Sequence, residues 1–299
     1  MRFVPKTGLL VAVVILATGV LLAEALAVTL EERFDKTVPL QSGGFFSLSN
    51  RNGSVVISSW DREEVRIEAL KKVKSSRRSR AREAMEDLRI EIDARGNDEV
   101  IVETDYPRGY GQGDGVGGVL DAIFGGRKRP QISVEYTITV PERVHLRVGT
   151  TNGRIEVEEV AGDATISSTN GRIDMSQVEG TIDVSTTNGR IELTDIEGGL
   201  EANTTNGGVE VRYSSHAEIT KDISIRTTNG GIVLELPKDI DADVQARTSN
   251  GHIDTDFPIT VKGRYGRKHL SGRINDGGPL IDLRTTNGSI NIRSSGVRI

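Results

Sequence analysis

Residues 150–203 read TTNGRIEVEEVAGDATIS, STNGRIDMSQVEGTIDVS and TTNGRIELTDIEGGLEAN, which are three consecutive units of equal length aligned on an Asn-Gly pair. A fixed period of this kind is the sequence signature of a repeat architecture, and it outweighs local signals. The same pair recurs outside these units with looser spacing. The eight pairs are Asn52-Gly53, Asn152-Gly153, Asn170-Gly171, Asn188-Gly189, Asn206-Gly207, Asn229-Gly230, Asn250-Gly251 and Asn287-Gly288.

Each unit contains two stretches in which apolar and polar residues alternate. Ala164 and Ile166 share one parity, as a strand with one buried face requires. After the Asn-Gly pair the parity changes, and Ile173 and Met175 then carry the apolar positions. Two strands and two corners per unit describe either one coil of a flattened β-solenoid or one hairpin of a meander.

The residues around the Asn-Gly pairs favour the coil. In a hairpin the turn would be flanked by apolar cross-strand partners, whereas small polar residues, mostly Thr-Thr, precede each Asn from Asn152 onward. Identical residues at the same place suit coils stacked ~4.8 Å apart, where like side chains form hydrogen-bonded ladders. We therefore expect Asn170, Asn188 and Asn206 to form an interior ladder, and the glycines to supply a positive φ at the corner.

The predicted fold class is all-β. It is a repetitive β-solenoid or β-helix with two strands in each repeating coil and one inserted amphipathic helix. An antiparallel β-sandwich or prism is the alternative. The core must be built from Val, Ile, Leu, Ala and Thr, because aromatic residues make up only 4% of the chain. This composition favours thin repeated layers over a bulky globular centre.

The pattern divides the chain into four segments. Residues 1–27 are a signal peptide or anchor, and residues 28–106 are an N-terminal β unit with a helical insertion near 76–92. Residues 107–130 contain eight glycines and are expected to be a flexible loop. Residues 131–299 are the TTNG-repeat solenoid. The apolar residues at helical spacing in the insertion are Ala81, Ala84, Met85 and Leu88.

The first 27 residues have the pattern of a secretory signal peptide. Arg2 and Lys6 precede an uncharged run over residues 8–23, and Ala25-Leu26-Ala27 offers a cleavage site. The alternative is an uncleaved membrane anchor, because the apolar stretch is just long enough to span a bilayer. Cleavage is favoured, since Glu24 would be costly deeper in lipid. In both readings we expect the remainder to be exported to the periplasm, the cell surface or the medium.

The ends of a solenoid need cover, because free strand edges pair with other chains. At the N-terminal end we expect Phe45, Phe46, Trp60 and the inserted helix to provide it. At the C-terminal end the sequence offers no helix or Pro-rich plug. We expect the last strand, near residues 289–293, to be an open edge or to pair back with an early strand. An open edge would be a surface for self-association.

Composition excludes several kinds of site. There is no Cys, which removes disulfides, thiolate metal sites and Cys nucleophiles. The net charge of −5 is mild and argues against nucleic-acid binding. We therefore expect no catalytic residue, no cofactor and no metal. The histidines lack metal-ligand spacing: His145, His216, His252 and His269.

A charged strip follows the corners. Arginines come directly after successive Asn-Gly pairs, and acidic residues lie two positions further on. The set is Arg154, Arg172 and Arg190 with Glu156, Asp174 and Glu192. In a solenoid these become adjacent columns on one outer face. They are either a recognition strip for an anionic glycan or a protein, or a solvated face in which neighbouring charges neutralise each other. The second interpretation is favoured.

Two further clusters carry weaker signals. Four arginines near the start of the predicted helix are more typical of an ordinary charged face than of a lipid contact. They are Arg77, Arg78, Arg80 and Arg82. The alternating Asp239, Asp241 and Asp243 could share a face, but no further ligand follows them. Neither cluster has the grouped carboxylates and base that glycoside cleavage needs.

The combined features resemble the bacterial putative-adhesin family, a domain-of-unknown-function family with repeated TTNG motifs (DUF4097-like). The matching residues are Asn52-Gly53-Ser54-Val55 with Trp60-Asp61, the Val140-Pro141 step, and the Thr-Thr-Asn-Gly units as far as Gly288. The resemblance covers nearly all of the chain after the signal segment and implies a β-helical or solenoid fold. It supplies no catalytic residues.

The sequence therefore predicts an exported, non-enzymatic protein that acts as an adhesin or as a surface or scaffold protein of the cell envelope. Its partner would be an envelope or extracellular protein or glycan, and a membrane would be contacted only through residues 1–27 if they are retained. The alternative is a polysaccharide-binding or polysaccharide-cleaving β-helix protein.

Overall fold

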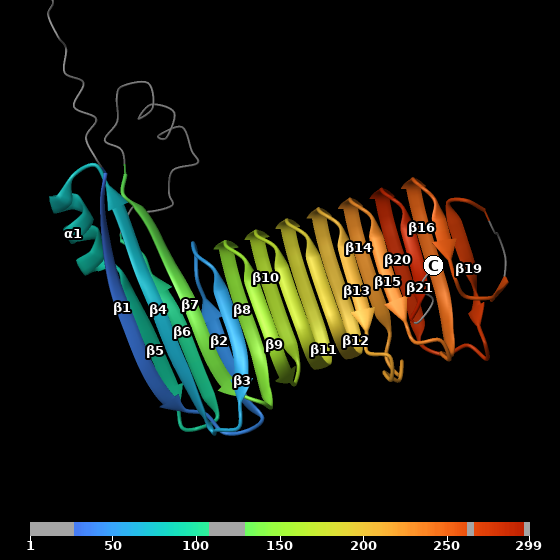
Figure 1. Cartoon of the computed structure of the whole chain (residues 1–299), viewed down its shortest axis with the longest axis horizontal. Helices are drawn as coiled ribbons and strands as arrows, with labels where there is room; N and C mark the ends of the chain where they lie inside the picture. The colour runs from blue at the N-terminus through green and yellow to red at the C-terminus, as the bar shows by residue number, and fades with distance from the viewer. Residues whose placement is uncertain (1–26, 108–128, 262–265, 296–299) are drawn as a thin grey trace, which may run out of the picture.

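The computed structural model describes residues 27–107, 129–261 and 266–295. The expectations for the signal segment and for the Gly-rich loop therefore fall outside the described residues. Strands stack one after another along the long axis of the molecule, and a short helix lies at the N-terminal end (Figure 1). Within the described residues, no helix is both long enough and apolar enough to cross a membrane.

One helix and twenty-one strands make up the described chain. In order they are β1 (Val28–Pro39), β2 (Gly44–Ser49), β3 (Val55–Trp60), β4 (Glu64–Ser75), α1 (Arg78–Asp87), β5 (Arg89–Arg95), β6 (Glu99–Asp105), β7 (Gln131–Pro141), β8 (Val144–Asn152), β9 (Ile155–Ala161), β10 (Ala164–Asn170), β11 (Ile173–Asn188), β12 (Ile191–Asn206), β13 (Val209–Tyr213), β14 (Ile223–Asn229), β15 (Ile232–Leu236), β16 (Ala242–Asn250), β17 (Ile253–Thr255), β18 (Ile259–Val261), β19 (His269–Ile274), β20 (Leu280–Asn287) and β21 (Ile290–Ser294).

The repeat strands pair in parallel, and the shift between partners equals the sequence period. Asn170 of β10 lies opposite Asn152 on one side and Asn188 on the other. The strands after the corner pair in the same way, with Ile173 opposite both Ile155 and Ile191. A hairpin would pair its two arms in antiparallel fashion. The parallel register therefore confirms the solenoid, and the antiparallel sandwich or prism is wrong for the array.

The core consists of rows of identical or similar side chains, one from each coil. Ile155, Ile173, Ile191 and Ile232 are all fully buried, and each lies in register with the same position of the next coil. β-branched residues suit a pleated surface that is packed on one side. Because every coil contributes the same thin layer, the chain builds a long core with few aromatic side chains.

The corners close in two ways. Opposite the Asn-Gly pairs, Glu159, Gln177 and Asp195 adopt left-handed conformations with φ between 52° and 57°. The expectation that the Asn-Gly glycines supply a positive φ is wrong for all of them except Gly53. These glycines are needed for a different reason. A Cβ on Gly171 would lie 1.8 Å from the carbonyl oxygen of Gly153 in the neighbouring coil. The close approach of stacked backbones excludes any side chain there.

At the N-terminal end the chain order differs from the spatial order. β2 pairs in parallel with both β6 and β8, and β3 pairs with both β7 and β9. The coil made by β2 and β3 therefore lies inside the solenoid, which begins before the predicted boundary at residue 131. Phe46 is fully buried within this inner coil.

The N-terminal cover is built from antiparallel strands rather than from aromatic residues. β4 pairs in antiparallel fashion with β7 and β1, and β5 pairs with β6. Phe45, Phe46 and Trp60 lie on β2 and β3, so the expectation that they cap the end is wrong. Helix α1 packs on β4 and β1 through Ala81, Ala84 and other apolar residues. It is shorter than the predicted insertion, because residues 89–95 form β5.

The C-terminal end shows a second reordering. β20 pairs in parallel with β14 and β16, and β21 pairs with β15 and β17. Residues 289–293 therefore lie inside the stack, and the expected open edge is wrong, so it offers no surface for self-association there. Beyond β16, the antiparallel strands β19 and β18 cover the last coil. The cover thus comes from β18 and β19, which the repeat pattern did not identify.

Candidate functional site

The Asn-Gly corners carry a continuous ladder of amide groups. Each Asn side chain donates from Nδ2 to Oδ1 of the Asn in the preceding coil, over distances of 2.6 to 2.8 Å. The ladder runs in spatial order through Asn52, Asn152, Asn170, Asn188, Asn206, Asn229, Asn287 and Asn250. The expected ladder therefore exists, but its members from Asn152 onward are exposed at the edge. The expectation that it is interior is wrong.

The ladder has one direction. Every amide donates toward the N-terminal end, where Nδ2 of Asn52 donates to the carbonyl oxygen of Ile132 at 3.4 Å. Aligned hydrogen bonds of this kind polarise one another and strengthen the chain of bonds. The interior position expected for Asn is instead held by the first Thr or Ser of each TTNG motif.

The first hydroxyl residue of each motif bonds one coil to the next from inside. The hydroxyls donate to backbone carbonyls at 2.8 to 3.5 Å, from residues Thr150, Ser168, Thr186, Thr204, Thr227, Thr248 and Thr285. All seven are buried, with 3 to 7% of their surface exposed. For Thr186 the acceptor is Gly171, the glycine whose close packing fixes the coil spacing. The TTNG motif therefore supplies two side-chain hydrogen bonds between coils, from the hydroxyl and from the amide, and a glycine that lets the stacked backbones approach closely.

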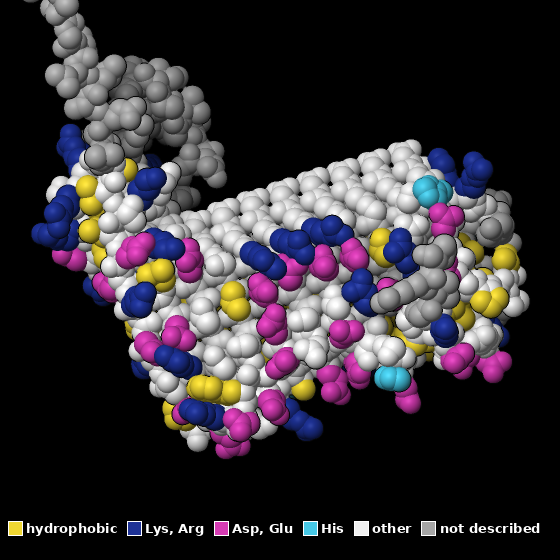
Figure 2. Space-filling view, in the orientation of Figure 1, with side chains coloured by type: hydrophobic (Ala, Val, Ile, Leu, Met, Phe, Trp, Pro, Cys, Tyr) yellow, Lys and Arg dark blue, Asp and Glu magenta, His cyan; other side chains and the backbone are white. Residues whose placement is uncertain are grey.

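The predicted charged strip is assembled as a zigzag network. Arg154 contacts Asp174 of the next coil at 2.6 Å and Glu156 of its own coil at 3.4 Å. Arg172 contacts Asp174 and, at 2.6 Å, Glu192. The pattern continues through Arg190 with Glu192 and Glu210, and through Arg212 with Glu210 and Glu235. Rows of basic and acidic side chains run side by side along the face seen in Figure 2.

This network neutralises itself. The hydrogen bond to the Asp174 carboxylate raises the pKa of Arg172, so the guanidinium of Arg172 stays charged. Four arginines face five carboxylates, and each of these arginines has acidic partners in two coils. The arrangement leaves no surplus of positive charge for an anionic ligand. The long edge above the strip is uncharged in Figure 2.

The two remaining predicted clusters, the helix arginines and the aspartates of residues 239–243, do not form a site. Among the described residues, the helix arginines Arg77, Arg78, Arg80 and Arg82 form no ion pairs with the acidic residues of α1. Asp243 contacts Arg273 at 3.5 Å, away from the other two aspartates of its run. Within the described part of the chain, no group of three or more His, Asp or Glu side chains is placed to hold a metal ion.

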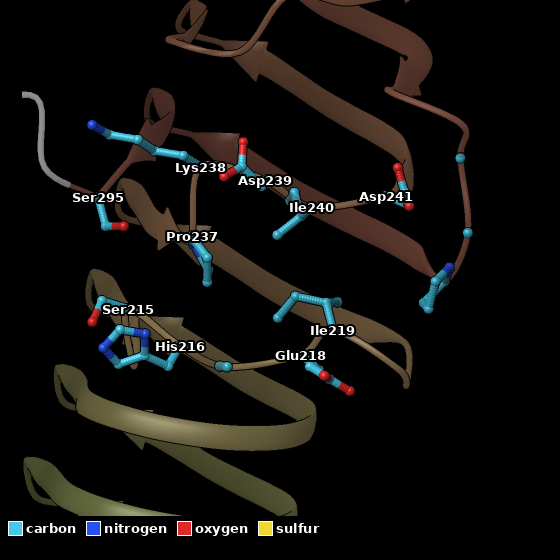
Figure 3. Close-up of a pocket in the computed structure, with 14 residues that line it drawn as sticks. Ser215, His216, Glu218, Ile219, Pro237, Lys238, Asp239, Ile240, Asp241 and Ser295 are labelled. Carbon is cyan, nitrogen blue, oxygen red and sulfur yellow. The ribbon is translucent and has the colours of Figure 1, made fainter.

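A pocket of about 660 Å³ lies where the loops of the late coils meet (Figure 3). Its walls come from the segments 214–222, 237–241 and 275–279, which connect the strands at the edge away from the ladder. The lining includes the buried Ile240, the apolar side chain of Ile219 and three acidic residues. These are Glu218, Asp239 and Asp241.

The repeat pattern did not reveal this pocket, although one signal pointed to it. The spacing between Asn-Gly pairs is constant in the regular coils from Asn152 to Asn206 and becomes longer and uneven afterwards. The extra residues form the loops that line the pocket. Asn275 holds one of them in place, because its Nδ2 donates to the carbonyl oxygen of Ile240 at 2.9 Å and its φ is 48°.

Comparison with known proteins gives a family and several structural likenesses. A family model described as Toastrack DUF4097 matches residues 131–293. A structure from Clostridium sporogenes, described as a putative cell adhesion protein, shares 12% identity with a TM-score of 0.37 and covers 88% of this chain and 100% of its own. A putative adhesin from Bacteroides fragilis shares 10% identity with a TM-score of 0.41, covering 88% of this chain and 97% of its own. A putative lipid binding protein from Parabacteroides distasonis shares 12% identity with a TM-score of 0.30, covering 87% and 96%. No curated protein matches the sequence.

Proposed function

We propose, from the premise that this chain belongs to the Toastrack DUF4097 family, that it is an exported, non-enzymatic adhesin or scaffold protein of the cell envelope. The match over residues 131–293 confirms the family predicted from the TTNG motifs. Its proposed role is to hold binding surfaces along a rigid rod.

One observation carries this proposal: the repeated polar side chains bond coil to coil. The Asn amides and the buried Thr hydroxyls each reach a neighbouring coil, and so do the arginines of the strip. These side chains hold neighbouring coils in a fixed position relative to each other. In the coils that carry the strip, displacing one coil relative to the next breaks all three kinds of contact at once, so this part of the stack resists such displacement.

Export is supported by the sequence of the signal segment, which has a basic start, an uncharged run and a small-residue site. The test is to place an epitope tag after Ile299 and fractionate the cells. We expect the tag outside the cytoplasm and exposed to added protease, and we expect deletion of residues 8–23 to keep it inside. Cytoplasmic location of the unaltered chain would contradict the proposal.

The partner can be sought directly. Immobilised chain is incubated with envelope extract, with and without residues 109–129, and the bound components are identified. We expect capture of an envelope protein or glycan by the repeat array in both forms. If the chain without residues 109–129 captured nothing, the binding role would belong to that segment and not to the repeat array.

The loop pocket favours a second candidate, a protein that cleaves polysaccharide. Glu218, Asp239 and Asp241 are among the residues that line one hollow, and glycoside cleavage uses paired carboxylates. A broad panel of envelope and extracellular glycans tests this candidate. Turnover that is lost in Glu218→Gln or Asp239→Asn would establish it and overturn the non-enzymatic proposal.

A further inference from the structure

The strands before the corners carry a second arginine row, separate from the strip on the strands after them. Arg226, Arg284 and Arg247 lie directly opposite one another in three adjacent coils. All three side chains are exposed. In the earlier coils the same position holds small neutral residues such as Ser185 and Asn203. The positive charge therefore begins abruptly at β14.

This row has too few acidic partners. Asp282 contacts both Arg226 and Arg284 at 2.9 Å, and Glu201 lies 3.8 Å from Arg226. Arg247 has no ion-pair partner among the described residues. Like charges directly opposite one another on paired strands destabilise a sheet. The molecule therefore maintains a charged row that works against its own stability, which is typical of a binding site.

The row lines a groove. A hollow of about 490 Å³ is bounded by the three arginines and by exposed hydroxyls one residue before the Asn ladder, among them Thr205, Thr228 and Thr286. A second hollow of about 740 Å³ shares Arg247 and continues past it. It adds Arg267, Lys268 and His269. Both volumes are in the range of ligand sites.

One buried atom in this region lacks a partner. Ser224 lies next to Asp282 in register, and its Oγ is buried without a hydrogen-bond partner in the described part of the chain. Buried hydroxyls are normally bonded. The polar layer of the arginine row is therefore incompletely satisfied by the protein, whereas the buried first Thr or Ser of each TTNG motif is bonded from coil to coil.

We propose that this groove binds a linear acidic polysaccharide. The planar guanidinium groups pair with carboxylates through two parallel hydrogen bonds, and they repeat every ~4.8 Å along the groove. The row of Thr hydroxyls beside them can donate to and accept from sugar hydroxyls. The proposal rests on the proposed function for the place where such a ligand is met, outside the cell.

The lining favours a polysaccharide over other polyanions. Among the described residues that line the two hollows, no Phe, Tyr or Trp is present to stack on nucleic-acid bases. The exposed apolar side chains that enter a lipid surface are also missing from this lining. Hydroxyls and guanidinium groups together match a ligand that carries both hydroxyls and carboxylates.

The test measures binding of fluorescently labelled oligogalacturonate to the full-length chain at low salt. We expect saturable binding that Arg247→Gln weakens about tenfold, corresponding to loss of one charge-assisted pair. The matched control is Arg190→Gln in the neutralised strip, which we expect to change the Kd by less than about twofold. Unlabelled neutral dextran should not compete.

Several results would overturn the proposal: no binding at low salt, equal weakening by Arg190→Gln, competition by dextran, or tighter binding of single-stranded DNA or anionic vesicles. The variant Arg247→Lys keeps the charge but loses the fork, so we expect intermediate affinity and an unchanged thermal unfolding midpoint. This variant decides the question if Arg247→Gln fails to fold. A chain that stays in the cytoplasm yet binds the oligomer would refute export and leave the groove intact.

Discussion

The two arginine rows of this molecule differ in how their charges are arranged, although one scaffold builds both. In the strip, each arginine follows a corner and an acidic residue comes two positions later, so successive coils place opposite charges side by side. In the groove, Arg226, Arg284 and Arg247 stand opposite one another, and the carboxylate of Asp282 contacts only the first two. Coil stacking amplifies whatever the sequence places at a position. Where each coil carries an arginine and a carboxylate, stacking produces a surface without net charge. Where the coils repeat an arginine with fewer carboxylates, stacking produces a positively charged patch.

Both arginine rows depend on the register between coils. We expect the largest loss of stability from a substitution that prevents the coils from stacking in this register. A Cβ at Gly189 would lie 1.9 Å from the carbonyl oxygen of Gly171, which is backbone and cannot move aside. We expect Gly189→Ala to lower the free energy of unfolding by about 3 kcal/mol or more. Urea unfolding measures this loss. The control is Gly208→Ala, whose nearest contact of 3.4 Å is ordinary, and a similar loss there would contradict the packing argument.

The bridging carboxylates sharpen the comparison. Asp174 in the strip and Asp282 in the groove each contact two arginines, and their side chains are 14% and 10% exposed. We expect Asp282→Asn to cost about 2 kcal/mol, because the arginines beside it keep only one distant partner, Glu201. We expect Asp174→Asn to cost less than about 1 kcal/mol, because each of its arginines keeps another carboxylate. Chemical denaturation measures the loss in free energy of unfolding for both variants. Equal losses would contradict the difference between the two rows.

The amide ladder, which separates the two rows, gives a smaller effect. Asn188→Ala removes two amide bonds of 2.8 Å at an exposed edge. We expect a loss of about 1 kcal/mol, near the net value of an ordinary hydrogen bond rather than of a buried unsatisfied group. Thr187→Ala, next to it and exposed, should change stability by less than about 0.5 kcal/mol. A loss in Thr187→Ala that matches the Asn188 variant would show that the ladder itself contributes little.

The smallest effect is a pH dependence of opposite sign at two aspartates. Partial burial and the neighbouring Glu201 raise the pKa of Asp183, so the folded chain holds that proton more tightly than the unfolded chain. Stability from this group is present at low pH and is lost as pH rises through the raised pKa. The backbone N–H of Thr181 donates to Asp163 at 3.0 Å and lowers the pKa of Asp163. Its contribution is present above the unfolded pKa and is lost as pH falls.

Thermal unfolding midpoints measured through the acid range, around the ordinary aspartate pKa of about 3.9, check both signs. Asp183→Asn should be stabilised relative to the unaltered chain at neutral pH, with the advantage shrinking on acidification. Asp163→Asn should be destabilised at neutral pH, with the deficit shrinking on acidification. A pH profile that moves in the same direction for both variants would contradict the assigned environments.

The regular part of the fold was predictable because a short, constant repeat period leaves few ways to stack. The parity changes at Ile173 and the repeated Thr-Thr before Asn placed strands, corners and ladder together. The position of the ladder was mispredicted, since parity places Asn188 on the same face as Thr186, whereas the chain turns at the corner and leaves Asn188 exposed. Burial fell instead to Thr186, two positions earlier.

The groove and the ends were beyond reach for another reason. Arg226 and Arg284 are far apart in the chain, and they become neighbours only because β20 enters between β14 and β16. A periodic pattern read in chain order cannot reveal a swap in the stacking order. The wider spacing after Asn206 signalled irregular coils, but it did not show which coil lies beside which.

The insertion of β20 and β21 also determines when the molecule can be completed. The coil of β16 and β17 is stacked one position away from the coil that precedes it in the chain, and only residues 280–294 fill the vacant layer. Folding therefore cannot simply propagate from one end, as it can in other repeat proteins. Until the last strands are in place, two pairs of facing strand edges stay unpaired in the middle of the stack: β14 with β16, and β15 with β17. A chain ending after β19 would present that gap to residues 280–294 of a second, full-length copy, which could join the two molecules by donating one coil.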